Sequence, residues 1–337
     1  MNSVGIVSVG TYIPRTYITA GDISAATQGK WTEKAITDKL GIVKKPVAAP
    51  NEGTQELGYL AAKACLQNAN FDPREIDVVL CMGEEYKEYP LTTSALYIQD
   101  KIGATNAWGI DLQNRCCTTV AAIKIAKDML IADDEINTIL IAGGYRNGDF
   151  IDYTDSNVSF MFNLGDGGGA ILLKKNHGRN RVLGTHIIAD ASLSRTAGVE
   201  IGGQVNPITA QNISQAAKSL RLMDAQAMKA RLNEVSMSNW FTCIDKALEK
   251  SQLTRVQLDY LAILHIKRSG HSAMLNELGL TPAQSIYLEN YGHLGQIDQI
   301  LSLELALKEG KVKDGSTVCM LSAGIGYVWA ANMIRWG

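Results

Sequence analysis

The stretch KACLQNANFDPREIDVVLCMG, residues 63–83, decides the fold, because KALEKSQLTRVQLDYLAILH, residues 246–265, repeats its pattern. Each stretch predicts a helix, a short loop, a hydrophobic residue followed by aspartate, and a strand that is apolar throughout. Further along, INTILIAGGY at 136–145 aligns with GSTVCMLSAG at 315–324. The offset is about 180 residues each time, so the chain is predicted to be a duplicated α/β unit.

The apolar strands indicate a sheet that is covered by helices on both faces. Residues 76–83 and 107–113 are both predicted to be buried strands of this kind. We expect two halves, 1–174 and 175–337, that share one interface. The stretch 175–239 joins the landmarks of the two halves, and we place the segment that lines the substrate there.

Composition excludes several classes of function. The chain has 337 residues, of which 46% are hydrophobic and 20% are charged, and this composition is typical of a globular enzyme. Its net charge is −2, so the sequence does not predict a basic surface that would bind nucleic acid or an anionic membrane. No leader-like segment or long apolar run is present, so we expect a cytoplasmic protein without membrane contact. The six cysteines lack the spacing and histidine partners of a zinc site, so no metal is expected.

The stretch GIDLQNRCCTTVAAIKIAKDML, residues 109–130, places Cys116 at a predicted turn from a strand to a helix. The strand is expected to end near Leu112, and an amphipathic helix to begin immediately after the cysteines. Backbone N–H groups and the positive end of the helix dipole favour a thiolate there, which is the nucleophilic form of cysteine. Cys117 follows into the helix and is expected to pack.

Two histidines are predicted to meet this cysteine. The strand before His265 delivers it at its carboxyl end, and a strand predicted at 285–290 ends in a turn that presents His293. In the repeat, Cys116 and His293 hold equivalent positions. Because open α/β sheets bind ligands beyond the carboxyl ends of their strands, we expect all three in one crevice.

The chemistry that needs these three residues is acyl transfer through a thioester on Cys116. His265 and His293 can each hydrogen-bond a thioester carbonyl, stabilise an enolate or move a proton. Glu84 follows a predicted strand near the crevice and is a candidate general base; the alternative is a solvated acidic loop.

Two glycine-rich stretches, 162–175 and 321–336, lie beside predicted buried strands. Missing side chains there would let the backbone approach a ligand or the cysteine, and the candidates are Gly167, Gly168, Gly324 and Gly326. Neither stretch matches a phosphate-binding loop or a dinucleotide fingerprint, so ATP and NAD are excluded.

Five ordered segments resemble the ketoacyl-ACP synthase III and HMG-CoA synthase branch of the thiolase superfamily. They span nearly the whole chain and read GIVSVGTYIP (5–14), KLGIVKK (39–45), DLQNRCCTT (111–119), YTDSNVSFMFNLGDGGGA (153–170) and LSAGIGYVWAANMIRW (321–336). The resemblance implies a thiolase-like five-layer αβαβα fold built from two duplicated halves, in a homodimer. It also implies an acyltransferase or condensing enzyme of fatty acid or polyketide biosynthesis. Such an enzyme uses acyl-CoA or an acyl carrier protein as the thioester donor and has no tightly bound cofactor.

The resemblance also assigns residues. The family's cysteine lies five residues after an aspartate, and Asp111 therefore selects Cys116. The histidine of the family's His-Gln-Ala-Asn motif falls on His265, but the motif here reads HIKR. The family's catalytic asparagine is replaced by His293, which leaves open whether the chain condenses with decarboxylation or only transfers acyl groups.

Further assignments concern the thioester donor and two alternative functions. Lys39 falls where relatives use a basic residue near the CoA adenine, and Lys267 and Arg268 are candidate contacts to a phosphopantetheine carrier; the alternative for all three is surface charge. Glu84 falls on the general acid/base of HMG-CoA synthases, which makes an aldol-type condensation the second hypothesis. The altered HIKR and GHLGQ motifs also allow a non-catalytic partner subunit.

Overall fold

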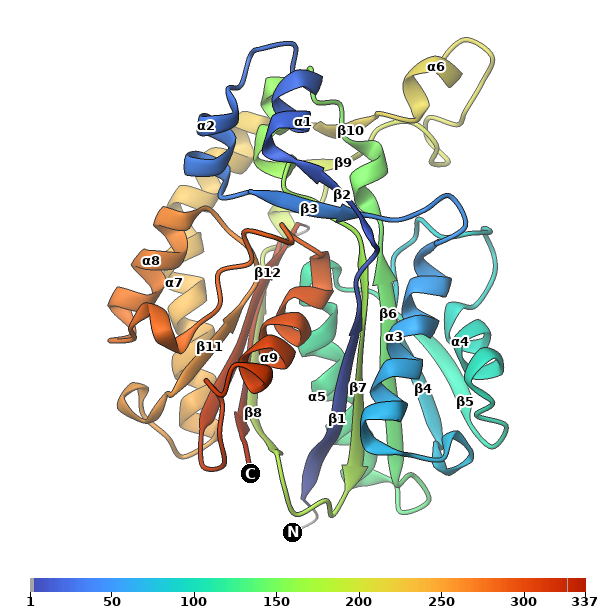
Figure 1. Ribbon diagram of the computed structural model, residues 1–337, viewed down its shortest axis with the longest axis vertical. Coiled ribbons are helices and arrows are strands. Elements are labelled where there is room, and N and C mark those ends of the chain that lie inside the picture. The colour runs from blue at the N-terminus through green and yellow to red at the C-terminus, as the bar shows by residue number, and fades with distance from the viewer. Residues whose placement is uncertain (1–2, 326) are drawn as a thin grey trace.

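The computed structural model describes residues 3–325 and 327–337 and forms a mixed α/β molecule around a nine-stranded sheet (Figure 1). The strand order is β11-β12-β13-β8-β1-β7-β6-β4-β5, and β8 and β1 pair at Arg181 and Gly5, where the two halves of the sheet meet. The strands of the first half are β1 Val4–Tyr12, β4 Val78–Met82, β5 Trp108–Leu112, β6 Thr138–Tyr145 and β7 Gly167–Lys175. Those of the second half are β8 Arg181–Ala189, β11 Tyr260–Ile263, β12 Thr317–Gly324 and β13 Val328–Arg335.

Helices divide the molecule into five layers, as the sequence predicted. Helices α5 (Thr118–Ala132) and α9 (Asp298–Lys308) contact strands of both halves and form the middle layer. One outer layer holds α3 (Thr54–Ala69) and α4 (Ser94–Ile102), and the other holds α7 (Ala225–Lys250) and α8 (Arg268–Glu277). Three short helices are α1 Ala20–Ala26, α2 Glu33–Ala35 and α6 Ile213–Ala216. Two small two-stranded sheets also form: β2 Thr16–Thr19 pairs with β3 Lys44–Val47, and β9 Ala197–Val199 pairs with β10 Leu220–Leu222.

Both halves follow a similar order of elements, but in the described residues the second half has no strand between α8 and α9. The first half runs β1-α3-β4-α4-β5-α5-β6-β7, and the second runs β8-α7-β11-α8-α9-β12-β13. The boundary expected after residue 174 falls one residue before the end of β7, and the division into two domains stays a prediction.

Two strand predictions were wrong in detail. At 285–290, Ser285 makes only an isolated bridge to Leu261, and the chain then leaves the sheet because the carbonyl of Glu289 accepts a hydrogen bond from Val43 N–H (2.8 Å). Strand β5 is present but is not buried: it pairs with β4 alone in the described sheet, which leaves Trp108 half exposed.

The parallel strands place the predicted site residues at one edge of the sheet. Strand β4 is parallel to both β5 and β6, and β11 is parallel to β12. Glu84 follows β4, Cys116 follows β5, and His265 follows β11. Carboxyl ends of parallel strands share an edge, which brings Glu84 and Cys116 to one side of the first half. In the second half, β12 ends at Gly324, which lies against the Cys116 turn, so the end of its parallel neighbour β11 faces the same region.

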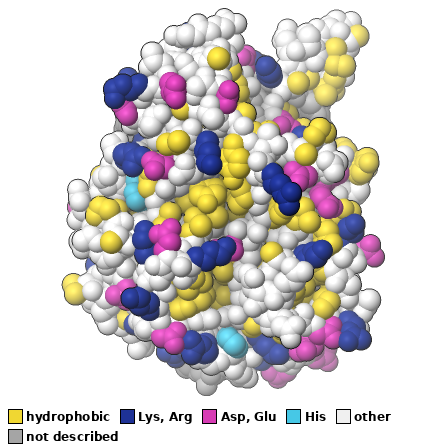
Figure 2. Space-filling view, viewed as in Figure 1, with side chains coloured by type: hydrophobic (Ala, Val, Ile, Leu, Met, Phe, Trp, Pro, Cys, Tyr) yellow, Lys and Arg dark blue, Asp and Glu magenta, His cyan; other side chains and the backbone are white. Residues whose placement is uncertain are grey.

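Within residues 3–325 and 327–337, the helices are all too short or too polar to cross a membrane. Figure 2 shows basic and acidic side chains interspersed over the face in view.

Candidate active site

Cys116 lies in a tight turn between β5 and α5. A single 3-10 turn, Arg115–Cys117, precedes the helix, which begins at Thr118, immediately after the cysteines, as the sequence predicted. Two hydrogen bonds of the Thr118 hydroxyl stabilise the turn: the hydroxyl accepts one from Asn114 N–H (2.8 Å) and donates one to the carbonyl of Arg115 (2.6 Å). Arg115 has a φ of 51°, the left-handed conformation that is unusual for a side chain of its size. The chain is therefore held in a strained turn that presents Cys116 at the start of a helix.

Gly324, at the end of β12, lets the second half approach this turn. A Cβ at Gly324 would lie 3.0 Å from the backbone nitrogen of Cys116 and 3.1 Å from the Cβ of Arg115. Ser322 on the same strand donates to the carbonyl of Cys116 (2.6 Å). Gly324 therefore packs directly against the turn that carries Cys116.

His293 lies next to Cys116. Its Nε2 is 3.1 Å from the Cys116 sulfur, and its Nδ1 is 2.6 Å from Oδ2 of Asp298, the first residue of α9. A carboxylate only accepts hydrogen bonds, so Nδ1 carries a proton and Nε2 faces the sulfur. The result is a thiol, an imidazole and a carboxylate in line.

The electrostatics of this group favour a charged histidine. Burial lowers the pKa of His293, but the negative charges of Cys116 and Asp298 outweigh burial and raise that pKa well above its usual value. A positive histidine beside a cysteine stabilises the thiolate. The arrangement suits a nucleophilic sulfur.

Asp298 was not identified from the sequence. It is fully buried, and its carboxylate also accepts from the backbone N–H groups of Leu294 and His265, each at 2.7 Å. An acidic residue in the first turn of a helix, five positions after a histidine, was the available signal. An acidic residue in a first turn usually only stabilises the helix through the helix dipole, so this pattern alone does not identify Asp298 as a residue of the site.

Glycines make the loop around His293 tight enough for this contact. Gly295 has a φ of 59°, and a Cβ there would overlap the ring of Tyr145. Gly167 of β7 packs against Leu294, whereas a Cβ at Gly168 would overlap the carbonyl of Leu57 in α3. Gly168 therefore serves the packing of the outer helix. Gly326 lies outside the described residues.

His265 lies in the same region but makes other contacts. Its Nδ1 is 3.1 Å from Nδ2 of Asn163, and its Nε2 is 3.1 Å from the carbonyl oxygen of Gly41. Burial lowers its pKa from 6.5 to about 4, so the ring is neutral near pH 7. Within the described part of the chain it makes no hydrogen bond to Cys116, and its role on the substrate stays a prediction.

Glu84 is buried at the end of β4, whereas its neighbour Glu85 is exposed. The Arg115 guanidinium lies 3.2 Å from the carboxylate of Glu84 and 3.3 Å from that of Glu85. Burial raises the pKa of Glu84 more than Arg115 lowers it. Glu84 thus contacts the turn that carries Cys116 and can hold a proton more readily than an exposed glutamate.

The basic candidates are at the surface. Lys39 lies in the helical turn Ile36–Leu40 and Lys267 precedes α8, and both are exposed. Arg268 pairs with Glu289 and lies over the ring of Tyr287 at 4.3 Å. Arg268 therefore has a structural partner, whereas both lysines extend into solvent.

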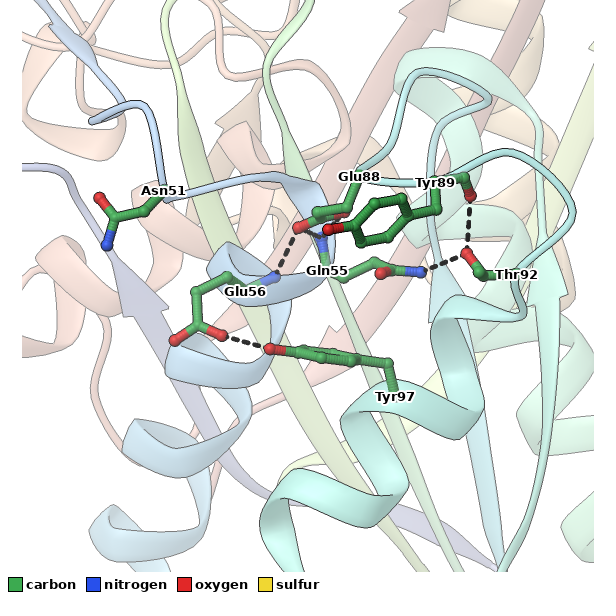
Figure 3. Close-up of a pocket in the computed structure, with 7 residues that line it drawn as sticks. All are labelled: Asn51, Gln55, Glu56, Glu88, Tyr89, Thr92 and Tyr97. Atoms are coloured by element: carbon green, nitrogen blue, oxygen red, sulfur yellow. Dashed lines mark hydrogen bonds between the residues drawn. The ribbon is translucent and has the colours of Figure 1, made fainter.

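A separate cavity of about 330 Å³ lies at the start of α3, away from these residues (Figure 3). Its polar groups already have partners: the Glu88 carboxylate accepts from the N–H of Gln55 (2.9 Å), and the Tyr97 hydroxyl donates to Glu56 (2.6 Å). Among residues 3–325 and 327–337, no cluster of histidine, cysteine or acidic side chains is arranged to hold a metal ion.

The comparisons with known proteins agree with one another. Residues 110–191 match the family model described as 3-oxoacyl-[acyl-carrier-protein (ACP)] synthase III, and residues 248–336 match the model of its C-terminal part. The β-ketoacyl-[acyl-carrier-protein] synthase III of Azobacteroides pseudotrichonymphae is 28% identical, over 98% of this chain and 97% of the relative. That of Synechocystis is 26% identical over the full length of both chains (100% each).

Solved structures resemble the whole chain. The 3-oxoacyl-[acyl-carrier-protein] synthase III of Aquifex aeolicus superposes with a TM-score of 0.84 at 21% identity, covering 99% of this chain and 100% of that one. The priming β-ketosynthase of the R1128 polyketide pathway gives a TM-score of 0.83 at 22% identity, covering 98% and 96%.

Proposed function

The chain belongs to the 3-oxoacyl-[acyl-carrier-protein] synthase III family of the thiolase superfamily and is an acyl-transferring condensing enzyme; from this premise we propose that it carries its acyl group on Cys116, with His293 as the base. The observation that carries the proposal is the line from Cys116 through His293 to Asp298, with contacts of 3.1 and 2.6 Å.

In the first step, the Cys116 thiolate attacks the carbonyl carbon of an acyl thioester. A new bond forms between that carbon and the Cys116 sulfur, the bond to the donor sulfur breaks, and the departing thiolate takes the proton from His293. The backbone N–H of Cys116, in the 3-10 turn before α5, is a candidate donor to the carbonyl oxygen. The neutral His265 is a second candidate, through its Nε2–H.

In the second step, the acceptor forms a bond to the acyl carbon, the bond between that carbon and the Cys116 sulfur breaks, and Cys116 leaves as the thiolate. Neutral His293 removes a proton from the acceptor, and Asp298 stabilises the imidazolium that results. This relay fits an acceptor that must lose a proton: a hydroxyl, an amine or the α-carbon of a second acyl thioester. A malonyl-type acceptor has less need of a base, because the departure of CO2 leaves the electron pair on carbon.

The donor is proposed to be an acyl thioester of CoA or of a carrier protein. Lys267 lies two residues after His265, and Lys39 lies two residues before Gly41, whose carbonyl contacts His265, so both exposed lysines belong to segments that meet at His265. Their charges suit the phosphates of CoA or phosphopantetheine. No tightly bound cofactor is required for either step.

Glu84 supports a second candidate function. Its buried carboxyl contacts the turn of Cys116 through Arg115 and has a raised pKa, which suits a general acid/base in an aldol condensation of the HMG-CoA synthase type. A non-catalytic subunit would need neither the Cys116 and His293 pair nor its buried carboxylate.

A homodimer and a cytoplasmic location are also proposed. Trp108 and Ile110 are exposed on the edge strand β5, where a second copy can pair and cover them. All six cysteines are free, which is typical of a reducing compartment.

The two steps can be tested separately. The acyl-enzyme is first formed with an acyl-CoA and isolated, and acceptors are then added: amines, alcohols, an acyl-CoA and malonyl-CoA. We expect deacylation by an acceptor that must lose a proton. Deacylation by malonyl-CoA alone, with release of CO2, would instead assign decarboxylative condensation.

A further inference from the structure

Asn163 contacts both histidines of the cleft. Its side-chain Nδ2 lies 3.1 Å from Nδ1 of His265, and its backbone carbonyl accepts from the N–H of His293 at 2.7 Å. One residue of the first half therefore touches the two histidines that the second half contributes.

The contacts determine which nitrogen of His265 carries the proton. The carbonyl of Gly41 only accepts, so Nε2 of His265 must donate to it. Nδ1 then holds a lone pair and accepts from the side-chain N–H of Asn163. A proton on Nδ1 would face the Asn163 NH2 group, donor against donor, so the neutral ring is favoured.

The backbone of Asn163 is firmly held. Gly165 N–H donates to the carbonyl of His293 (2.9 Å), and the buried Lys45 ammonium donates to the carbonyl of Leu164 (2.6 Å). Gly292 has a φ of 67°, and a Cβ there would overlap the Asn163 carbonyl. The segment and the His293 loop can approach this closely only because residue 292 is glycine.

Charged and titratable groups surround the His265 ring from several elements. They are Asp298, His293, Arg268, His271 and Tyr287. Asp298 favours protonation of the ring, but burial outweighs it, since His265 is only 3% exposed. The hydrogen-bond partners of the His265 ring and its burial therefore both favour the neutral state.

We propose that Asn163 is a positioning residue that holds His265 as a neutral Nε2–H donor and leaves His293 as the base of the cleft. When substrate binds, Nε2–H passes from the Gly41 carbonyl to a thioester carbonyl oxygen, where a neutral donor stabilises the developing charge. This kinetic role rests on the proposed function, whereas the tautomer itself does not.

The test uses the whole protein labelled with ¹⁵N in its histidines. The ring nitrogen shifts are recorded between pH 8 and pH 5 for the wild type, Asn163→Asp and Asn163→Leu, and His265→Gln identifies the signals of His265. We expect one bare nitrogen, Nδ1, and one protonated nitrogen, Nε2, in the wild type throughout this range. Asn163→Asp is expected to turn the ring into an imidazolium, because a carboxylate accepts from Nδ1–H. Asn163→Leu is expected to keep the proton on Nε2, because the Gly41 carbonyl still accepts from it, and to shift the Nδ1 signal, because that nitrogen loses its hydrogen bond.

A wild-type ring that is protonated on Nδ1, or one unaffected by Asn163→Asp, would overturn the proposal. Asn106→Asp, at an exposed asparagine bonded to the carbonyl of Arg74, is the matched control and should leave the His265 signals unchanged. For the kinetic role, Asn163→Leu is expected to lower kcat of the overall transfer about tenfold, with a smaller change in KM. If no acceptor or donor reacts at all, the proposed function fails, and the NMR result still decides the role of Asn163.

Discussion

The Nδ1 nitrogen of His293 lies 2.6 Å from the Oδ2 oxygen of Asp298, a fully buried carboxylate at the start of α9. This contact fixes the proton on Nδ1 and directs Nε2 to the sulfur of Cys116. It gives the second half of the molecule a direct part in activating the nucleophile of the first half.

Replacing Asp298 tests this contact. Asp298→Asn keeps the shape but presents an NH2 group or a neutral oxygen to His293, so the imidazole loses its orientation and its charge partner. We expect acylation of Cys116 to slow by about 100- to 10,000-fold, the range found for general acid–base groups. Quenched-flow mass spectrometry measures the rate, with the exposed Asp128→Asn on α5 as control. An acylation rate within threefold of wild type would contradict the role of Asp298.

Gly295→Ala tests the tight loop that carries His293. The new Cβ overlaps the Tyr145 ring at a φ of 59°, so the loop must shift, and we expect a loss of about 2–4 kcal/mol in unfolding free energy together with slower acylation. Gly310→Ala is the matched control, because Gly310 has a φ of 67° but nothing within 4 Å of its added Cβ. It should lose only about 1 kcal/mol. Urea unfolding measures both, and equal losses would show that strain, not the contact with Tyr145, sets the cost.

His271 predicts a dependence of stability on pH. Burial lowers its pKa from 6.5 to about 4, and its Nε2 lies 2.9 Å from the Ser285 hydroxyl. A lowered histidine pKa contributes stability that is complete above pH 6.5 and is lost as the pH falls toward 4, because the unfolded chain binds the proton first.

The measurement compares wild type with His271→Gln by urea unfolding at pH 7 and pH 4.5. Between pH 7 and pH 4.5, the wild type is expected to lose about 2–3 kcal/mol more unfolding free energy than His271→Gln loses. The comparison between proteins matters, because burial raises the pKa of Asp166 to about 6, which acts in the opposite direction in both. A difference that stays constant with pH would exclude the effect.

The edge strand β5 predicts the oligomeric state. If a second copy covers Trp108 and Ile110, Trp108→Arg is expected to convert a dimer into a monomer, as measured by analytical ultracentrifugation at micromolar concentration. Val256→Arg is the control, because Val256 is also exposed but lies at the far side of the second half, before β11. A wild-type monomer, or a dimer unaffected by Trp108→Arg, would show that this edge is not the interface.

Much of the fold was predictable because it depends on local pattern. Apolar strands, helices and the repeat between 63–83 and 246–265 are visible in the sequence, and the position of Cys116 follows from them. The burial of β5 was predicted wrongly, since an edge strand and a central strand can carry the same apolar residues. The stretch 285–290 has the composition of a strand, but its backbone bonds to Val43 instead.

The site was only partly predictable. Cys116 and His293 could be related through the repeat, but Asp298 and Asn163 acquire their contacts only when distant segments pack together. An asparagine before a glycine-rich strand and an aspartate at a helix start are common in structural roles. The roles of Asn163 and Asp298 therefore depend on which side chains they contact in the folded protein.

The most direct test of the account is the mass of the intact protein after incubation with a panel of acyl-CoAs, for wild type and Cys116→Ala. We predict that the wild type gains the mass of one acyl group and that Cys116→Ala gains none. Labelling that persists in Cys116→Ala, or a wild type that no donor labels, would contradict the assignment of Cys116 as the acyl carrier.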